Sequence, residues 1–355
     1  MNLKKNVPLA PYTSFGLGGN AQNFVAVHST DELLEVLKDS QVKPIWLIGY
    51  GSNTLISDEG LEGLVICLRG GKIDIDDRCI TVDAGVWWDD VVKTAIDHGL
   101  WGSEMMSEIP GSVGAALYIN ITAYGQSIGP LVRWIDIWDT ESSSIERLTK
   151  DQLSWDYKKS VFQLPERKSL VILRACLELS HEVTNELIYQ KALDVAKELE
   201  LNPGDLVDRR KIITEARRRA GSLWAPDQKN SAKTVGSFFR NPVVSQELAE
   251  RIMSFDESGK THEEIKRMNK VHGGDQKRVS AAHVMLAAGF KRGQEWGKVK
   301  LNDQNLLKIE AMSGATAQEV YDVAMNIQAV CEEKLGVTLQ PEAKILGNFQ
   351  KTTQK

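Results

Sequence analysis

The most informative stretch of the chain is residues 45–57, Ile-Trp-Leu-Ile-Gly-Tyr-Gly-Ser-Asn-Thr-Leu-Ile-Ser. An apolar run leads directly into glycines at 49 and 51, and a second apolar run follows. Glycine tolerates positive φ and lets the backbone approach a ligand closely. Successive N–H groups in such a turn can form an anion site suited to a diphosphate. Taken alone, the turn could also be a plain hairpin, since its spacing matches neither the G-x-G-x-x-G fingerprint nor the P-loop.

Length and charge narrow the class of protein. A chain of 355 residues is expected to form two or three domains. Its net charge of -5 argues against non-specific nucleic-acid binding. No apolar run reaches the ~20 residues needed to span a bilayer, and the N-terminus lacks the apolar core of a signal peptide. We therefore expect a cytoplasmic protein with neither a nucleic-acid nor a membrane partner.

The cysteines and histidines suggest neither disulfides nor a metal. The four cysteines are far apart and form no C-x-x-C, which is typical of reduced, mostly buried thiols. The six histidines show no paired spacing, so no metal site is predicted.

Capping signals and periodicity predict helices separated by short strands. Capping boxes at residues 29–32 and 316–319 each begin a helix, and Gly99 and Gly336 each follow one. The first helix leads to the strand before the glycine loop, which gives a small β-α-β unit. Further helices are predicted near 87–98, 185–201, 206–219 and 281–288, and a strand near 306–310. A change of pattern near 179–185 predicts a domain boundary.

Two more stretches could contact a ligand. Residues 108–116 and 120–125 are dense in small side chains, which would let backbone lie against a flat molecule. A tight helix–strand junction is an equally good interpretation. The run Arg217-Arg218-Arg219 lies on a predicted helix, where three consecutive arginines point in different directions. A solvated face is the default interpretation, and a phosphate site would need one or two of them.

Together, eight motifs in one order resemble a known family. They are residues 12–19, 49–53, 57–60, 109–111, 123–125, 157–162, 236–242 and 341–342. This order resembles the UDP-N-acetylenolpyruvoylglucosamine reductase (UDP-N-acetylmuramate dehydrogenase) family over nearly the whole chain. Each motif is weak singly, but their combination is specific.

The resemblance implies an α+β chain with a vanillyl-alcohol-oxidase/PCMH-type FAD-binding fold and a C-terminal α/β substrate-binding domain. We expect an FAD-binding domain of two α/β subdomains over residues 1–180 and the substrate-binding domain over 181–350. The family binds FAD non-covalently, and NADPH serves as its hydride donor. The enolpyruvyl ether of a UDP-sugar is then reduced to a lactyl ether during peptidoglycan-precursor synthesis. The chain is expected to be a monomer.

The chemistry requires a proton donor and stabilisation of an enolate-like intermediate. By resemblance, Ser237 donates the proton to C2, Glu342 supports the intermediate and its protonation, and Lys158 carries the stabilising charge. The alternatives are a turn cap for Ser237 and a surface carboxylate for Glu342. No histidine or aspartate stands beside Ser237 in the sequence, which disfavours a Ser-His-Asp hydrolase.

The resemblance also assigns binding residues. The predicted cofactor-binding residues are Gly49, Tyr50, Gly51, Ser52, Asn53, Ile109, Pro110, Gly111, Ser112, Gly114, Ala123, Tyr124 and Gly125. The predicted substrate-binding residues are Tyr157, Tyr189, Arg217 and Asn241. Tyr189 could equally be a core or helix-surface tyrosine.

Four positions depart from the family pattern. Lys158 stands where the family has an arginine, so the charge is kept but the planar fork is lost. Tyr50 and Thr122 each replace a glycine, and Ala220 stands where a lysine for the substrate diphosphate is usual. These departures leave two alternatives open. One is a different FAD-dependent oxidoreductase of the same superfold acting on a sugar or alcohol, and the other is a non-catalytic paralogue that binds a UDP-sugar or flavin.

Overall fold

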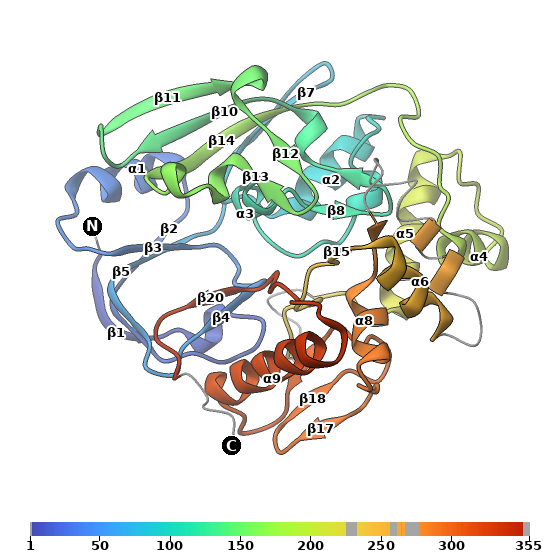
Figure 1. Cartoon of the computed structure of the whole chain (residues 1–355). Helices are drawn as coiled ribbons and strands as arrows, with labels where there is room; N and C mark the ends of the chain where they lie inside the picture. The colour runs from blue at the N-terminus through green and yellow to red at the C-terminus, as the bar shows by residue number, and fades with distance from the viewer. Residues whose placement is uncertain (1, 225–232, 256–260, 264, 267–276, 351–355) are drawn as a thin grey trace. The chain divides into compact units, whose positions relative to one another are not determined.

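The computed structural model describes residues 2–224, 233–255, 261–263, 265–266 and 277–350 (Figure 1). Within them, the chain forms two compact units, each assembled from separate segments. The first unit contains the described residues of Met1–Val7, Gln22–Tyr50 and Glu62–Lys229. The second contains those of Pro8–Ala21, Gly51–Leu61 and Asn230–Lys355. Residues 181–224 therefore pack with the first unit, while the predicted functional division at residue 180 stays a prediction.

A four-stranded sheet carries the strand that leads into the glycine loop. Its order is β1 (Lys4–Pro8), β2 (Asn20–Val27), β5 (Leu61–Leu68) and β3 (Ile45–Ile48). Helix α1 (Thr30–Asp39) connects β2 to β3 and begins at Ser29, whose side chain accepts from the Glu32 N–H. The chain order β2, α1, β3 confirms the predicted β-α-β unit, and β5 lies between its two strands and pairs in parallel with β3.

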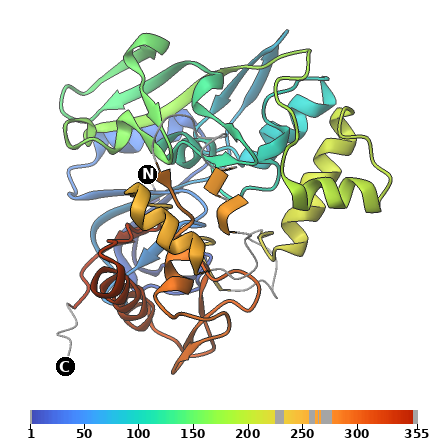
Figure 2. The same ribbon diagram turned by 45° about the vertical axis from the view of Figure 1, so that its right-hand side comes forward.

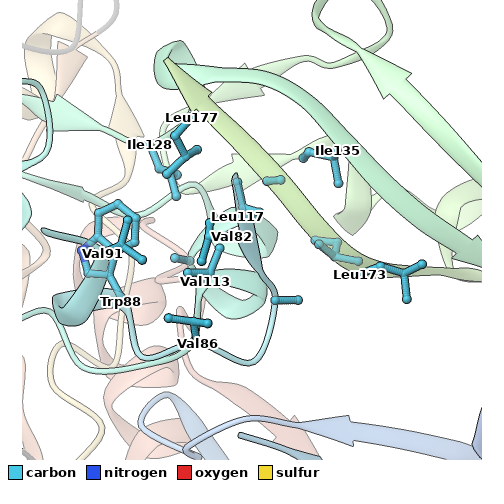
Figure 3. Packing of buried hydrophobic residues seen from close by; sticks show 14 of the residues in the cluster. Val82, Val86, Trp88, Val91, Val113, Leu117, Ile128, Ile135, Leu173 and Leu177 are labelled. Atoms are coloured by element: carbon cyan, nitrogen blue, oxygen red, sulfur yellow. The ribbon is translucent and has the colours of Figure 1, made fainter. Parts of the chain in front are cut away.

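An antiparallel five-stranded sheet forms the largest layer of the first unit (Figure 1). Its order is β11 (Ser144–Thr149), β10 (Val132–Asp139), β14 (Leu170–Glu178), β7 (Cys79–Asp83) and β6 (Ile73–Asp76). Helices α2 (Trp88–Asp97) and α3 (Val113–Ile119) share one hydrophobic core with its inner face. Figure 3 shows Val113 and Leu117 of α3 close to Val82 of β7. This packing fixes the loop between α2 and α3, where one ligand-binding stretch is predicted.

A helical pair completes the first unit (Figure 2, yellow-green). Helices α4 (Gln190–Glu198) and α5 (Leu206–Arg219) pack around a small cluster that includes Met105, Leu187 and Ile212. The prediction of a helix from residue 185 was wrong at its start. Leu187 is buried in the cluster from the segment before α4, and Tyr189 is the extended residue that caps the helix. The predicted bounds of α5 are confirmed.

Two short hairpins also belong to the first unit. They are β8 (Thr122–Ala123) with β9 (Gln126–Ser127), and β12 (Trp155–Asp156) with β13 (Lys159–Ser160).

The second unit combines small sheets with helices around its own core. Two of its sheets are strand pairs, β4 (Thr54–Ile56) with β20 (Lys344–Leu346) and β15 (Val243–Val244) with β16 (Lys277–Arg278). A third sheet has the order β17 (Glu295–Trp296), β18 (Val299–Leu301) and β19 (Ile309–Ala311). Its helices are α6 (Gln246–Ser254), α8 (Ala281–Ala287) and α9 (Ala317–Leu335). The strand expected near 306–310 is thus shifted toward the C-terminus.

The predicted start and end of helix α9 are both confirmed. The capping box between Thr316 and Glu319 is formed, and Gly336 ends α9 with a φ of 66°. None of the helices in the described part of the chain is both long and apolar enough to cross a membrane.

Candidate active site

The predicted diphosphate loop begins in the first unit and ends in the second. The chain passes from one to the other between Tyr50 and Gly51. On the first side, the Gly49 carbonyl accepts from the Arg69 Nε at 3.0 Å. A Cβ built on Gly49 would lie 2.7 Å from the Ser112 Oγ, so this loop and the second predicted cofactor stretch meet closely. Glycine is required here because a side chain would displace that serine.

On the second side, the loop lies against the N-terminal motif. Gly51 has a φ of 62°, and a Cβ there would overlap the Tyr12 carbonyl oxygen. The Ser14 N–H donates to the Gly51 carbonyl at 3.1 Å, and the Ser14 Oγ donates to the Ser52 carbonyl at 3.4 Å. Residues 12–19 therefore form a packed, specific loop, as their aromatic residues suggest.

The Tyr50 ring contacts one cationic and one aromatic side chain. The Arg69 guanidinium lies 5.0 Å from the centre of its ring, and the Trp87 ring packs edge-on at 4.6 Å. Burial raises the pKa of Tyr50, against the lowering effect of Arg69. The tyrosine is thus neutral at pH 7 and held by contacts of its own. Arg69 and Trp87 were not predicted from the sequence, because no short motif marks them.

The stretch 109–114 runs beside the segment 84–88. The Trp88 N–H donates to the Gly111 carbonyl at 2.9 Å, and the Gly114 N–H donates to the Ala84 carbonyl at 2.8 Å. Ser112 caps α3 by accepting from the Ala115 N–H at 3.3 Å. Ile109 and Pro110, which precede this pairing, are partly exposed. The stretch follows a short 3-10 turn and leads into α3, so it is not a helix–strand junction, and its predicted role in ligand binding stays a prediction.

The turn Tyr124-Gly125 joins β8 to β9. Both residues have positive φ, 46° and 87°, which is the type I′ geometry of two-residue hairpins. Burial raises the pKa of Tyr124, and the nearby Arg217 opposes that rise. The Tyr189 ring packs edge-on against Tyr124 at 5.3 Å. A predicted cofactor residue and a predicted substrate residue are therefore in contact. Ala123 ends β8 just before the turn.

One of the three arginines turns inward. Arg218 and Arg219 form ion pairs with Glu215 and Glu198 on the exposed side of the helices. Arg217 instead donates from its Nη2 to the carbonyls of Glu108, at 3.2 Å, and Ser222. Burial lowers the pKa of Arg217, and its Nε is buried without a hydrogen-bond partner among the described residues. Arg217 is thus the arginine of this run whose side chain packs inside the protein, and its binding of a substrate anion stays a prediction.

Lys158 and Tyr157 form the two-residue turn between β12 and β13. Lys158 has a φ of 56°, and its carbonyl accepts from the Gln163 Nε2 at 3.2 Å. The Ser160 Oγ, on the same hairpin, donates to the Tyr118 carbonyl of α3 at 2.6 Å. The lysine therefore projects from a turn that is fixed to α3.

In the second unit, Ser237 and Glu342 lie on adjacent segments. The Glu342 N–H donates to the carbonyl of Phe238 at 2.7 Å, and Phe239 bridges to Pro341. Asn53 joins the same group, since its Nδ2 donates to the Glu342 carbonyl at 3.2 Å. The structure thus brings together the predicted catalytic pair and the end of the predicted diphosphate loop.

Asn241 has a structural contact as well as its predicted role. Its Oδ1 accepts from the Ala281 N–H at 2.9 Å, at the start of α8. This bond ties the segment after Ser237 to a helix of the second unit.

A charged network of Asp89, Arg210 and Glu108 was not predicted from the sequence. Asp89 is fully buried and accepts a two-pronged contact from Arg210, both distances being 2.8 Å, together with the Glu108 N–H at 2.7 Å. Burial would raise the pKa of Asp89, but the hydrogen bonds from Arg210 and Glu108 outweigh it and lower the pKa. Burial and the negative charge of Asp89 raise the pKa of Glu108. No residue pattern in the sequence connects Asp89 with Arg210.

No group of three or more His, Cys, Asp or Glu residues that could hold a metal occurs among the residues described.

Comparison with known proteins gives two family matches and full-length relatives. Residues 21–145 match an FAD binding domain, and residues 227–346 match the C-terminal domain of UDP-N-acetylenolpyruvoylglucosamine reductase. The reductase of Thermobifida fusca (strain YX) is 31% identical, over 97% of this chain and 98% of the relative. The reductase of Streptomyces coelicolor (strain ATCC BAA-471 / A3(2) / M145) is 28% identical, over 96% of this chain and 90% of the relative. The crystal structure of the enzyme from Thermus caldophilus superposes with a TM-score of 0.65 at 21% identity, covering 98% of this chain and 100% of that one.

These matches define a flavoprotein oxidoreductase with the predicted FAD-binding fold and a separate C-terminal domain. The chain belongs to the UDP-N-acetylenolpyruvoylglucosamine reductase family. The prediction of the family and of the fold class is confirmed.

Proposed function

We propose that this chain uses NADPH and FAD to reduce the enolpyruvyl ether of UDP-N-acetylglucosamine enolpyruvate, giving UDP-N-acetylmuramate for peptidoglycan synthesis. The full-length similarity to reductases of that name supports this proposal. The structural observation that carries it is the hydrogen bond between Glu342 and Phe238, which holds the glutamate beside the segment of Ser237.

The chemistry of the predicted cofactor residues fits a flavin nucleotide. A Cβ at Gly49 would lie too close to the Ser112 Oγ, so the two glycine-containing loops approach each other through backbone at this point. FAD would be held by the backbone of residues 49–53, 109–114 and 123–125, with Tyr50 and Tyr124 contributing neutral phenol groups. When bound, FAD supplies the hydride transfer from NADPH to the substrate. The chain contributes placement, charge and a proton.

Ser237 is proposed to protonate C2 of the substrate. After hydride addition at C3, negative charge is shared between C2 and the substrate carboxylate. A hydroxyl is a weak acid, but an enolate carbon is a strong base, so transfer of the Oγ proton forms the new C–H bond. Glu342, held next to this segment, supports the intermediate and the return of a proton to Ser237.

Lys158 is proposed to stabilise the enolate oxygen. An ammonium group directed at developing negative charge lowers the barrier in a water-poor site. Lysine presents a point charge, so it orients the carboxylate less rigidly than the family's arginine would. Tyr157, its neighbour in the turn, is assigned to substrate binding.

The UDP portion is proposed to contact Arg217, Tyr189 and Asn241. Arg217 offers a buried cation whose Nε has no partner among the described residues, which favours an anionic ligand. Its charge replaces the lysine that is missing at Ala220. The Tyr189 ring, supported by Tyr124, can cover the substrate.

An anaerobic absorbance experiment tests the proposal. The purified protein, loaded with FAD, is reduced with NADPH and then given UDP-N-acetylglucosamine enolpyruvate. The proposal expects rapid return of the oxidised flavin spectrum and formation of the lactyl ether. Reduction without return would favour a different acceptor, which dioxygen or a panel of sugars and alcohols would identify. A protein that takes up no FAD would favour a non-catalytic paralogue.

We further propose that the chain acts in the cytoplasm as a monomer. Light scattering on a sizing column should then give one species of about 39.5 kDa. A dimer at micromolar concentration would contradict the monomer.

A further inference from the structure

Two cysteines lie next to each other on the outer face of the five-stranded sheet. Strand β14 pairs with β7 so that Cys176 is opposite Thr81 and Glu178 is opposite Cys79. Cys79 and Cys176 are therefore diagonal neighbours on one face of the sheet. Burial raises the pKa of the Cys176 thiol, and Cys79 is close enough to Cys176 to raise that pKa further. Both are free thiols in this structure.

An arginine crosses over the pair. The Nη1 of Arg133, on β10, donates to the Cys79 sulfur at 3.4 Å, and the guanidinium also lies near Glu178 and Cys176. Because β14 lies between β10 and β7, this side chain spans the strand that carries Cys176. The guanidinium therefore lies directly beside the sulfur of Cys79.

Exposure separates Cys79 from the other three cysteines. All four lie in the described residues, and Cys67, Cys176 and Cys331 are buried while Cys79 is partly exposed. Burial and the neighbouring Cys79 raise the pKa of Cys176 to about 11, so it stays a thiol at neutral pH. The pair thus combines an accessible sulfur beside a cation with a buried thiol that keeps its proton.

We propose that Cys79 and Cys176 are an oxidisable pair that a peroxide converts into a reversible disulfide. The Cys79 thiolate attacks one peroxide oxygen, the O–O bond breaks, and the sulfur loses two electrons to become a sulfenic acid. The leaving oxygen takes a proton and departs as water. The Cys176 sulfur then attacks Cys79, the S–O bond breaks, and the thiol proton leaves with the hydroxyl as a second water. In sum, two thiols and hydrogen peroxide give one disulfide and two waters.

The geometry makes this disulfide easy to reverse. Diagonal Cα atoms lie ~7–8 Å apart in an antiparallel pair, while relaxed disulfides span at most ~6.8 Å. Closing the bond therefore needs a local shift of β7 against β14, and a strained disulfide is readily reduced by an external dithiol. Strand β7 continues into the segment 84–88, which pairs with the predicted flavin loop, so oxidation changes the support of that loop.

Thiol mapping of the whole protein tests the proposal. Reduced protein is treated with hydrogen peroxide, alkylated, digested and analysed by mass spectrometry. The expected result is loss of two of the four thiols, a linked peptide joining residues 79 and 176, and full recovery with dithiothreitol. In the Cys176→Ser variant, Cys79 should instead be trapped as a sulfenic acid by dimedone. Cys331→Ala, at a buried thiol of the second unit, should react like the unaltered protein.

The role of Arg133 is tested separately. Arg133→Gln should slow alkylation of Cys79 by roughly tenfold, because the attacking sulfur loses the guanidinium that lies 3.4 Å away. Arg78→Gln removes the same charge from the residue beside Cys79 without removing that contact, and its effect should be smaller. The proposal is overturned if Cys79 oxidises no faster than Cys67 and Cys331, or if it links two chains together. Neither readout depends on flavin or on reductase activity.

Discussion

The backbone N–H of Glu342 donates to the carbonyl oxygen of Phe238 over 2.7 Å, and this bond joins the two segments that carry the predicted acid and its supporting carboxylate. The Phe238 and Phe239 rings, 0% and 1% exposed, anchor one segment in the core of the second unit. Backbone pairing and core packing thus set the spacing between Ser237 and Glu342. The positions of these two residues can therefore survive substitution of either side chain.

Replacing Ser237 by alanine separates its chemical role from a structural one. In Ser237→Ala, the rate of flavin reduction by NADPH should be nearly unchanged. Reoxidation by the enolpyruvyl substrate should slow by about 10²–10⁴-fold, because that is the usual contribution of a general acid to the rate. Stopped-flow absorbance measures both steps. Ser254→Ala, on α6 of the same unit, should leave both rates unchanged. Loss of FAD binding in Ser237→Ala would mean that the serine is structural.

Lys158 can be tested by changing its charge and its shape independently. Lys158→Met should lower the rate of reoxidation by about 10²-fold, because the enolate loses its cation. Lys158→Arg should be tolerated or should raise turnover. Lys159→Met, the adjacent exposed lysine on β13, serves as the control for charge. If Lys158→Arg abolishes turnover while FAD stays bound, the site accepts lysine alone.

Gly51 should tolerate no side chain. Gly51→Ala combines a left-handed backbone, which disfavours alanine by about 1–2 kcal/mol, with overlap against the Tyr12 carbonyl, for which about 1–3 kcal/mol more is expected. Urea denaturation measures the free energy of unfolding. Gly99→Ala is the matched control, since Gly99 has a φ of 68° but a Cβ at that position would meet no atom within 4 Å. Equal losses in the two variants would show that the contact with Tyr12 is unimportant.

Arg210 should be needed for folding stability. Arg210→Met leaves the Asp89 carboxylate buried without its main partner, which typically lowers the free energy of unfolding by about 3–5 kcal/mol. The double variant Asp89→Asn, Arg210→Met should recover part of the loss, because the isolated charge is removed. Arg219→Met, which breaks exposed ion pairs, should change stability little. A small effect of Arg210→Met would mean that water replaces the guanidinium.

Glu108 should make stability depend on pH. Its folded-state pKa is raised from the ordinary 4.5, so the fold favours the protonated carboxyl and the free energy of unfolding falls as pH rises through that range. Glu108→Gln should therefore raise stability at pH 7 and change it little at pH 4. Denaturation at both pH values measures the difference, with Glu186→Gln as an exposed control. A gain of equal size at both pH values would contradict the electrostatic explanation.

The family, the fold class and most helix ends could be predicted from the order of residues alone. The Ser29 cap, the capping box at 316–319 and the glycines at 99 and 336 act through neighbouring backbone groups, so they can be predicted locally, although the Glu32 side chain accepts from the His28 N–H and does not complete the box predicted at 29–32. The order of eight short motifs identified the fold because each keeps its own spacing.

Which distant groups meet is set by the folded chain. Arg217 turns inward while Arg218 and Arg219 pair with glutamates, and Tyr189 packs against Tyr124. Asp89 joins Arg210 across 121 residues of sequence, and Cys79 joins Cys176 across two strands. Such contacts depend on the register of strands and the packing of helices, which are set by the whole core. No local pattern of residues encodes them.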